Sequence, residues 1–94
     1  MKESTVIMRS SGISWCDLGK EIVILRVRDN AYYRLGATAR DLWLRLDRPR
    51  SVSDLVGEMC ASCEGDPARI GPETTEFLQQ CMDLELVNME HAVG

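Results

Sequence analysis

The chain has 94 residues, of which 45% are hydrophobic and 28% are charged, and its formal net charge is −4. This length is typical of one small domain, and no apolar run approaches the ~20 residues of a membrane-spanning helix. The excess of acidic residues disfavours a protein that binds nucleic acid or an anionic membrane with its whole surface. We therefore expect one domain over residues 1–94 and no membrane partner.

The N-terminal segment and the cysteines bear on the cellular compartment. Residues 1–14 are mixed and polar, without the apolar stretch of a secretory signal, so we expect a cytoplasmic protein with free thiols. Cys60 and Cys63 have the C-x-x-C spacing of many zinc sites. Cys16 and Cys81 are isolated in the sequence, whereas a zinc ribbon would supply a second close pair. We expect no metal site, and a redox or metal module on Cys60 and Cys63 is the minor alternative.

The first half of the chain alternates between apolar and polar residues, as β-strands do. Residues 13–18 and 21–28 form a predicted hairpin around a Gly-Lys turn, with an apolar face and an arginine face on the second strand. The apolar face comprises Val23, Leu25 and Val27. An Asp-Asn pair that tolerates positive φ makes the next turn, and residues 31–35 form a third strand. The sequence predicts a three-stranded antiparallel meander.

From Ala37 the apolar residues recur every three to four positions, which is typical of an amphipathic helix. The first predicted helix begins at Ala37 and ends before Pro49. Ser51 has the character of an N-cap, and Asp54 follows three residues later. A second helix is therefore expected to run to about Ser62.

The third predicted helix follows a polar loop. Residues 64–71 contain glycines and a proline and form this predicted loop. Pro72 suits the first turn of a helix that ends at about Leu84. Residues 86–89 could close as a short last strand. The order β-β-β-α-α-α, with this possible C-terminal strand, predicts an α+β fold of the winged helix-turn-helix type.

A winged helix-turn-helix domain commonly places a recognition helix in the major groove of DNA. The third predicted helix carries Glu73, Glu76 and Asp83 and no basic residue, so it would bring like charges to the phosphates. Residues 20–50 carry eight bases and four acids, whereas residues 51–94 carry one base and nine acids. We expect no nucleic-acid partner. A transcription regulator that contacts DNA through the basic segment is the alternative.

Four short stretches, in this order and spacing, resemble the PqqD-like family. They are residues 32–39 (YYRLGATA), Leu42-Trp43, residues 50–56 (RSVSDLV) and the segment from Phe77-Leu78 to Leu86-Val87. The resemblance covers about residues 13–89, which implies that the core of the domain lies in this range. Gly36 stands where the family usually has asparagine, and both residues accept a capping conformation with positive φ, so we expect the turn to be retained.

The resemblance implies a peptide-recognition domain for ribosomally synthesised, post-translationally modified peptides. Such a domain captures the leader segment of a precursor peptide and presents it to a maturation enzyme, such as a leader peptidase, without catalysing a reaction itself. The double tyrosine before Leu35 and the tryptophan at Trp43 resemble the stand-alone members of lasso-peptide pathways. Within the family, a PqqD-type chaperone of pyrroloquinoline quinone synthesis is the alternative.

A peptide could bind to this chain by adding a strand to the meander, because the third strand has an unpaired edge. We expect the leader to lie between residues 31–35 and 77–84, with Arg28 or Arg34 attracting its acidic residues. Its apolar side chains would enter pockets lined by Tyr33, Phe77, Cys81 and Leu84. The predicted peptide-binding residues are Arg28, Ala31, Tyr32, Tyr33, Arg34, Leu35, Phe77, Gln80, Cys81 and Leu84.

Catalytic groups are nearly absent from the sequence. His91 is the only histidine, and there is neither a Ser/His/Asp arrangement nor a glycine loop of the kind that binds phosphate. We therefore expect no enzyme activity and no cofactor. An unpaired strand edge also permits exchange between copies, so a monomer or a weak dimer is expected.

Overall fold

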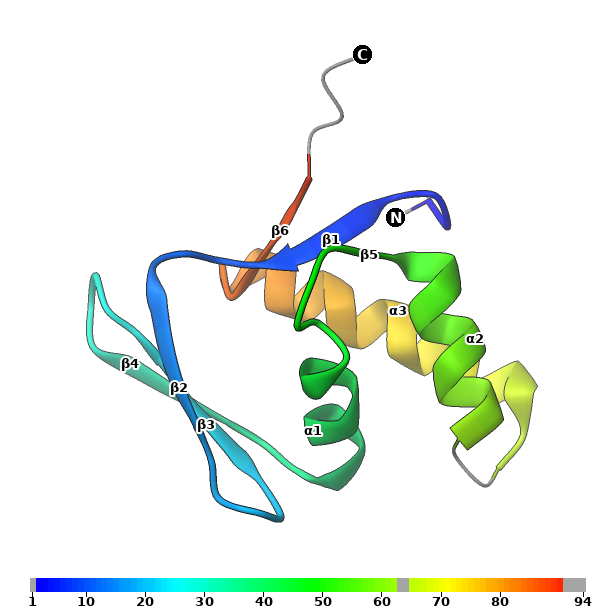
Figure 1. The fold of residues 1–94 in the computed structure, drawn as a ribbon, viewed down its shortest axis with the longest axis horizontal. Coiled ribbons are helices and arrows are strands. Elements are labelled where there is room, and N and C mark those ends of the chain that lie inside the picture. The colour runs from blue at the N-terminus through cyan, green and yellow to red at the C-terminus, as the bar shows by residue number, and fades with distance from the viewer. Residues whose placement is uncertain (1, 63–64, 91–94) are drawn as a thin grey trace.

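The computed structural model describes residues 2–62 and 65–90 (Figure 1). The elements in chain order are β1 (Val6–Arg9), β2 (Ile13–Asp17), β3 (Ile22–Arg26), β4 (Ala31–Leu35), α1 (Ala37–Leu44), β5 (Arg50–Ser51), α2 (Val52–Ser62), α3 (Pro67–Asp83) and β6 (Val87–Met89). They form two three-stranded antiparallel sheets and three helices. None of the described helices is long and apolar enough to span a bilayer.

The first sheet is the predicted meander, in the order β2-β3-β4. Its register runs from Ile13 opposite Arg26 to Asp17 opposite Ile22, and β3 pairs with β4 from Ile22 opposite Leu35 to Arg26 opposite Ala31. Asn30 takes a φ of 56° in the β3–β4 turn, which confirms the prediction for the Asp-Asn pair.

The buried face of β3 is the opposite of the face predicted to be apolar. Ile22 and Ile24 are fully buried, whereas Val23 and Leu25 are half-buried and Val27 is exposed. Arg26 shares that face at the end of the strand, where its guanidinium is paired with Asp29 at 2.7 Å and donates to the Leu84 carbonyl at 2.6 Å. The isoleucines on the arginine face can therefore fill the core.

The second sheet, in the order β5-β1-β6, was only partly predicted. The C-terminal strand is confirmed as β6, but β1 and β5 were not expected. Val6 pairs with Ser51 and Arg9 pairs with Val87, so the partners of β1 lie far along the chain. A strand of four residues with such distant partners leaves little local pattern in the sequence.

The helices agree with the prediction in number and order. The Ser51 hydroxyl accepts a hydrogen bond from the Asp54 N–H at 3.1 Å, which confirms the predicted cap of α2. Gly36 is the N-cap of α1, but its φ is −80°, so the expected positive φ is wrong. The chain enters α1 directly from the extended conformation of β4.

The start of α3 was predicted five residues too late. The helix begins at Pro67, and the Asp66 side chain accepts a hydrogen bond from the Ala68 N–H at 3.0 Å. Pro72 lies inside the helix, where it removes one main-chain donor close to the N-terminus. Arg69 therefore belongs to α3, and the expectation of a helix without basic residues is wrong, although its acidic residues still outnumber this one base.

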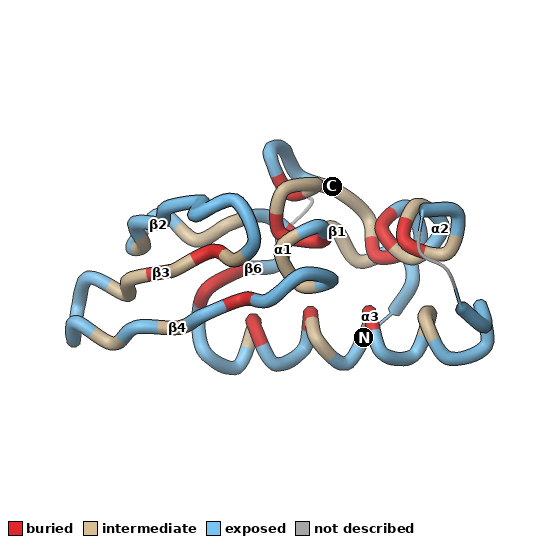
Figure 2. Tube along the Cα trace, turned by 90° about the horizontal axis from the view of Figure 1, so that it is seen from below, coloured by how far each residue is buried: buried red, intermediate tan, exposed pale blue. Residues whose placement is uncertain are grey.

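The core lies between the two sheets and the helices, as the red segments of Figure 2 indicate. Trp43 of α1 is fully buried, and Trp15 of β2 meets it edge to face with ring centroids 6.3 Å apart. The guanidinium of Arg9 lies 4.5 Å from the Trp15 ring and 5.2 Å from the Trp43 ring, and donates to the Trp43 carbonyl oxygen at 2.6 Å. Both tryptophans are thus packing residues, and Arg9 connects β1 to α1.

Replacement of Leu78 by alanine tests this account of the core. Leu78 of α3 is fully buried, so Leu78→Ala is expected to lower the free energy of unfolding by about 2–4 kcal/mol. Leu18 is 56% exposed, and Leu18→Ala is expected to cost less than about 0.5 kcal/mol. Urea denaturation followed by circular dichroism measures both, and equal losses would contradict the proposed core.

Candidate functional site

Within residues 2–62 and 65–90 no strand pairs with the outer edge of β4, and the hydrogen-bond register identifies the main-chain groups at this open edge. The Val27 N–H donates to the Gly12 carbonyl at 3.1 Å, and the Leu18 N–H donates to the Glu21 carbonyl at 2.8 Å. Because bonding direction alternates along an antiparallel strand, the odd-numbered residues of β3 bond to β2 and the even-numbered ones to β4. In β4 it follows that the N–H and C=O groups of Tyr32 and Arg34 point to the open edge.

The side chains of β4 alternate between the two faces of the sheet. Tyr33 is half-buried and packs against the core, and Leu35 is 6% exposed. Tyr32 is 68% exposed on the opposite face. Arg34 lies on that outer face as well, 3.2 Å from the Glu21 carboxylate. The inner face of the edge strand is therefore apolar, and the outer face is aromatic and charged.

Helix α3 lies on the β4 side of the first sheet (Figure 2). The residues that α3 turns toward the core include Leu78 and Cys81, which are buried, and Phe77, which is half-buried. Leu84, the C-cap of α3, is 36% exposed. The C-terminal half of α3 thus offers partly exposed apolar side chains on the side where β4 has its open edge.

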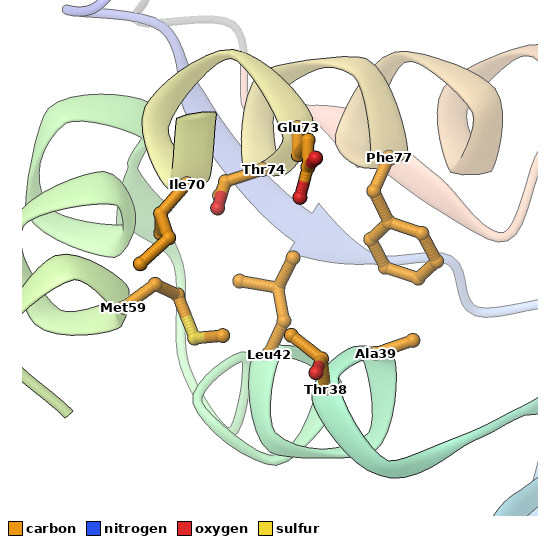
Figure 3. A pocket seen from close by; sticks show the side chains of 8 residues that line it. All are labelled: Thr38, Ala39, Leu42, Met59, Ile70, Glu73, Thr74 and Phe77. Atoms are coloured by element: carbon orange, nitrogen blue, oxygen red, sulfur yellow. The ribbon is translucent and has the colours of Figure 1, made fainter. Parts of the chain in front are cut away.

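A pocket of about 330 Å³ continues this apolar surface beyond the end of β4. Figure 3 shows α1 on one side and α3 on the other, with side chains from both pointing into the space between them. The lining residues are Thr38, Ala39, Leu42, Met59, Ile70, Glu73, Thr74 and Phe77. The lining is mostly apolar, and Glu73 is its one charged group. Such a pocket suits an apolar side chain.

The other end of the site is fixed by two arginines. Arg26 donates to the Leu84 carbonyl at 2.6 Å, and its guanidinium lies 5.4 Å from the centre of the Tyr33 ring. Arg28 forms an ion pair with Glu85, the residue that follows the α3 C-cap. These contacts connect the β3–β4 hairpin to the C-terminus of α3. They thereby set the distance between the two walls of the site, which are β4 and the C-terminal half of α3.

The predicted site residues fall into three groups. Tyr33, Phe77 and Leu84 lie on the β4–α3 side as expected. Leu35 and Cys81 are buried in the core, and burial raises the pKa of the Cys81 thiol to about 12, so neither offers an accessible side chain. The remaining residues lie at the margins of the site and are described separately.

Tyr32 points to the outer face, so only its main chain can contribute to the open edge. Ala31 is half-buried at the turn end of β4, and Arg28 already pairs with Glu85. Gln80 is exposed and lines a different hollow, with Glu3 and Val56 among its neighbours. Its expected place in the groove wall is therefore not supported by the geometry.

The prediction missed the pocket between α1 and α3. Ile70 had been assigned to a loop because α3 was expected to begin at Pro72. Leu42, a buried residue of the core, also lines the pocket. The missed signal was Asp66-Pro67, an N-cap followed by proline at the first helical position.

The described residues, 2–62 and 65–90, contain no cluster of histidine, cysteine or carboxylate residues that could hold a metal ion. Cys16 is exposed, and Cys60 is half-buried. Cys63 and His91 lie outside the described residues, so the minor alternative on Cys60 and Cys63 is not tested.

Comparison with known proteins identifies the family. Residues 21–87 match the PqqD family, described as coenzyme PQQ synthesis protein D. The chain belongs to the PqqD family. The matched range includes β3, β4 and all three helices, and thus both walls of the site.

A solved structure entitled "TbiB1 in Complex with the TbiA(beta) Leader Peptide" has the same fold as this PqqD-family chain. Its TM-score is 0.78 at 21% sequence identity, over 93% of this chain and 99% of TbiB1. A search of the curated proteins found no match to the chain. The predicted resemblance and the α+β fold class are confirmed.

The Arg26–Asp29 pair predicts how stability depends on pH. The hydrogen bonds from Arg26 lower the pKa of Asp29 to about 2, from an ordinary value of 3.8. A carboxyl group whose pKa is lower in the folded state than in the unfolded state stabilises the fold. For Asp29 this stabilisation is complete above about pH 4 and is lost as the pH falls toward about 2. The Asp29→Asn variant should therefore be less stable than the wild type at neutral pH and should converge with it in acid. Urea midpoints measured across this range test the expectation, which fails if the difference is independent of pH.

Proposed function

We propose that this PqqD-family protein is a non-catalytic adaptor that binds the leader of a precursor peptide as an added strand on β4. The observation that carries the proposal is the open edge of β4, with the apolar side of α3 next to it and a pocket at the end of the strand. The shared fold with TbiB1, a protein solved with a leader peptide, supports it. The leader would then be presented to a maturation enzyme such as a leader peptidase.

Strand addition uses main-chain groups that any peptide possesses. A leader strand would exchange hydrogen bonds with Tyr32 and Arg34, whose N–H and C=O groups point outward. Leader residues paired with these two would place their side chains on the outer face. The leader residue between them would lie opposite Tyr33 and face α3. This arrangement favours a leader with an apolar residue flanked by polar ones.

The pocket between α1 and α3 would supply selectivity. A volume of about 330 Å³ accommodates one large aliphatic or aromatic side chain. A leader that continues past Leu35 would reach Ala39 and Phe77 at the mouth of this pocket. At the opposite end Arg28 already pairs with Glu85, so an acidic leader residue that Arg28 attracted would have to share this arginine with Glu85.

The sequence resemblance favours a lasso-peptide pathway over pyrroloquinoline quinone synthesis, because of the double tyrosine and Trp43. Binding of this kind requires neither a catalytic group nor a cofactor, and a cytoplasmic location suits a protein that meets a newly made precursor. The acidic residues of α3, Glu73, Glu76 and Asp83, argue against its use as a DNA-recognition helix.

A proline at position 32 tests the role of the main chain. Tyr32→Pro removes an outward N–H but no β3–β4 hydrogen bond, so it should weaken leader binding about tenfold while the fold persists. Tyr32→Ala keeps the N–H and is the matched control, with an expected change of less than about threefold. Fluorescence anisotropy with a labelled leader from the neighbouring precursor gene measures both, beside a DNA duplex of random sequence. Equal affinities for the two variants would exclude pairing at this edge.

A tryptophan at the pocket mouth tests the role of the pocket. Thr38 is exposed and lines the pocket, so Thr38→Trp should fill it and weaken leader binding about tenfold. Gln79→Trp adds the same side chain to an exposed position of α3 outside the pocket and should leave the affinity unchanged.

Salt-sensitive binding of the DNA duplex without any peptide signal would instead support the transcription regulator.

A further inference from the structure

The first sheet has a second open edge, at β2, which the proposed leader site does not use. The order β2-β3-β4 leaves β2 without a neighbour on one side in the described part of the chain. The register that bonds Gly12 to Val27 and Leu18 to Glu21 directs the even-numbered residues of β2 toward β3. The N–H and C=O groups of Ile13, Trp15 and Asp17 therefore point outward.

This edge has few of the features that usually prevent strands of different molecules from pairing, and its one inward-pointing charge, Asp17, is already paired with Arg40. Natural edge strands are protected by lysine, proline, bulges or inward-pointing charges. The β2 sequence, ISWCD, contains no lysine or proline, and its pairing with β3 is continuous from Ile13 to Asp17. Its one charged side chain, Asp17, is held within the molecule by two hydrogen bonds from Arg40, each of 2.8 Å.

We propose that two copies of the chain associate through antiparallel pairing of their β2 strands. The outward residues are symmetric about Trp15. A two-fold axis at Trp15 pairs this residue with itself and pairs Ile13 with Asp17 of the second copy, in both directions. This register uses all three outward residues and forms about six main-chain hydrogen bonds. A shift of two residues in either direction would leave one outward residue of each copy without a partner. The β2 strand is therefore most complementary to its own copy in this register.

The side chains are compatible with this pairing. On the inner face, the two Trp15 side chains become cross-strand neighbours, and each is 37% exposed in the single chain. On the outer face, Ser14 lies opposite Cys16 of the second copy, and both are uncharged and exposed. No like charges stand directly opposite each other. Because each edge is only five residues long, we expect a weak, concentration-dependent dimer.

The association leaves the leader site free. β2 and β4 are the opposite edges of one sheet, so the dimer would form a continuous six-stranded sheet with an open β4 at each end. Each dimer could therefore bind two leaders. A failure of leader binding would not affect this proposal, and a monomeric protein would not affect leader binding.

A designed disulfide tests the register. Ser14 and Cys16 of two copies form a non-hydrogen-bonded pair, in which the Cα atoms are about 4.5 Å apart, a distance a disulfide can bridge. The variant Ser14→Cys, with Cys60 and Cys63 replaced by serine, should form a covalent dimer in a glutathione redox buffer. Mass spectrometry of the peptides should find the bond between positions 14 and 16. Addition of Cys16→Ser to this variant should remove that bond. As a control for the other edge, Tyr32→Cys on β4, with Ser14 retained and Cys60 and Cys63 replaced by serine, should give no covalent dimer.

A second measurement does not depend on oxidation. Sedimentation velocity of the wild-type protein over a range of concentrations should show reversible dimers. Ser14→Lys, an exposed change that places two lysines as diagonal neighbours on the outer face of the paired strands, should raise the dissociation constant at least about fivefold. A wild-type protein that stays monomeric into the millimolar range would overturn the proposal. So would a dimer that Ser14→Lys leaves unchanged, because its interface would then lie elsewhere on the molecule.

Discussion

The hydrogen-bond register of the β2-β3-β4 sheet is the constraint on which the other features of the molecule depend. The bonds from Val27 to Gly12 and from Leu18 to Glu21 fix which residues of β3 bond to which neighbour. That alternation places the isoleucines of β3 in the core and leaves outward main-chain groups at both edges of the sheet. A shift of one residue would exchange the two faces, exposing Ile22 and Ile24 and removing Tyr33 from the α3 side.

The register alone would not make a binding site, because the sheet must also be held at a fixed distance from α3. Arg26 and Arg28 do this at the hairpin end, where one donates to the Leu84 carbonyl and the other pairs with Glu85. At the opposite end β4 passes directly into α1, which packs near α3 around the pocket (Figure 3). Both walls are thus held in place by contacts within the chain, which would lower the entropic cost of binding a peptide.

Local sequence patterns predicted most of this architecture, and non-local pairing explains what they missed. The meander and α2 follow from alternation, turn residues and the Ser51 cap, all of which act over a few positions. β1 and β5 depend on partners far along the chain, so their residues show no pattern of their own. The same holds for the candidate site: strand and helix periodicity placed Tyr33, Phe77 and Leu84 on the β4–α3 side, where the structure has them, and their role in binding stays a prediction. The pocket depends on how α1 meets α3, and α3 begins at Pro67 after the Asp66 cap, five residues before the start that Pro72 suggested.

The division between main-chain and side-chain contacts suggests how a domain this small could be selective. Hydrogen bonds to Tyr32 and Arg34 would be available to any extended peptide, so they supply affinity without discrimination. Discrimination must then come from the few positions where side chains of the peptide meet a shaped surface, namely the α3 side of β4 and the pocket. A pathway could change the leader it accepts by altering Ala39, Ile70 or Phe77 while the sheet register, and with it the fold, stays the same.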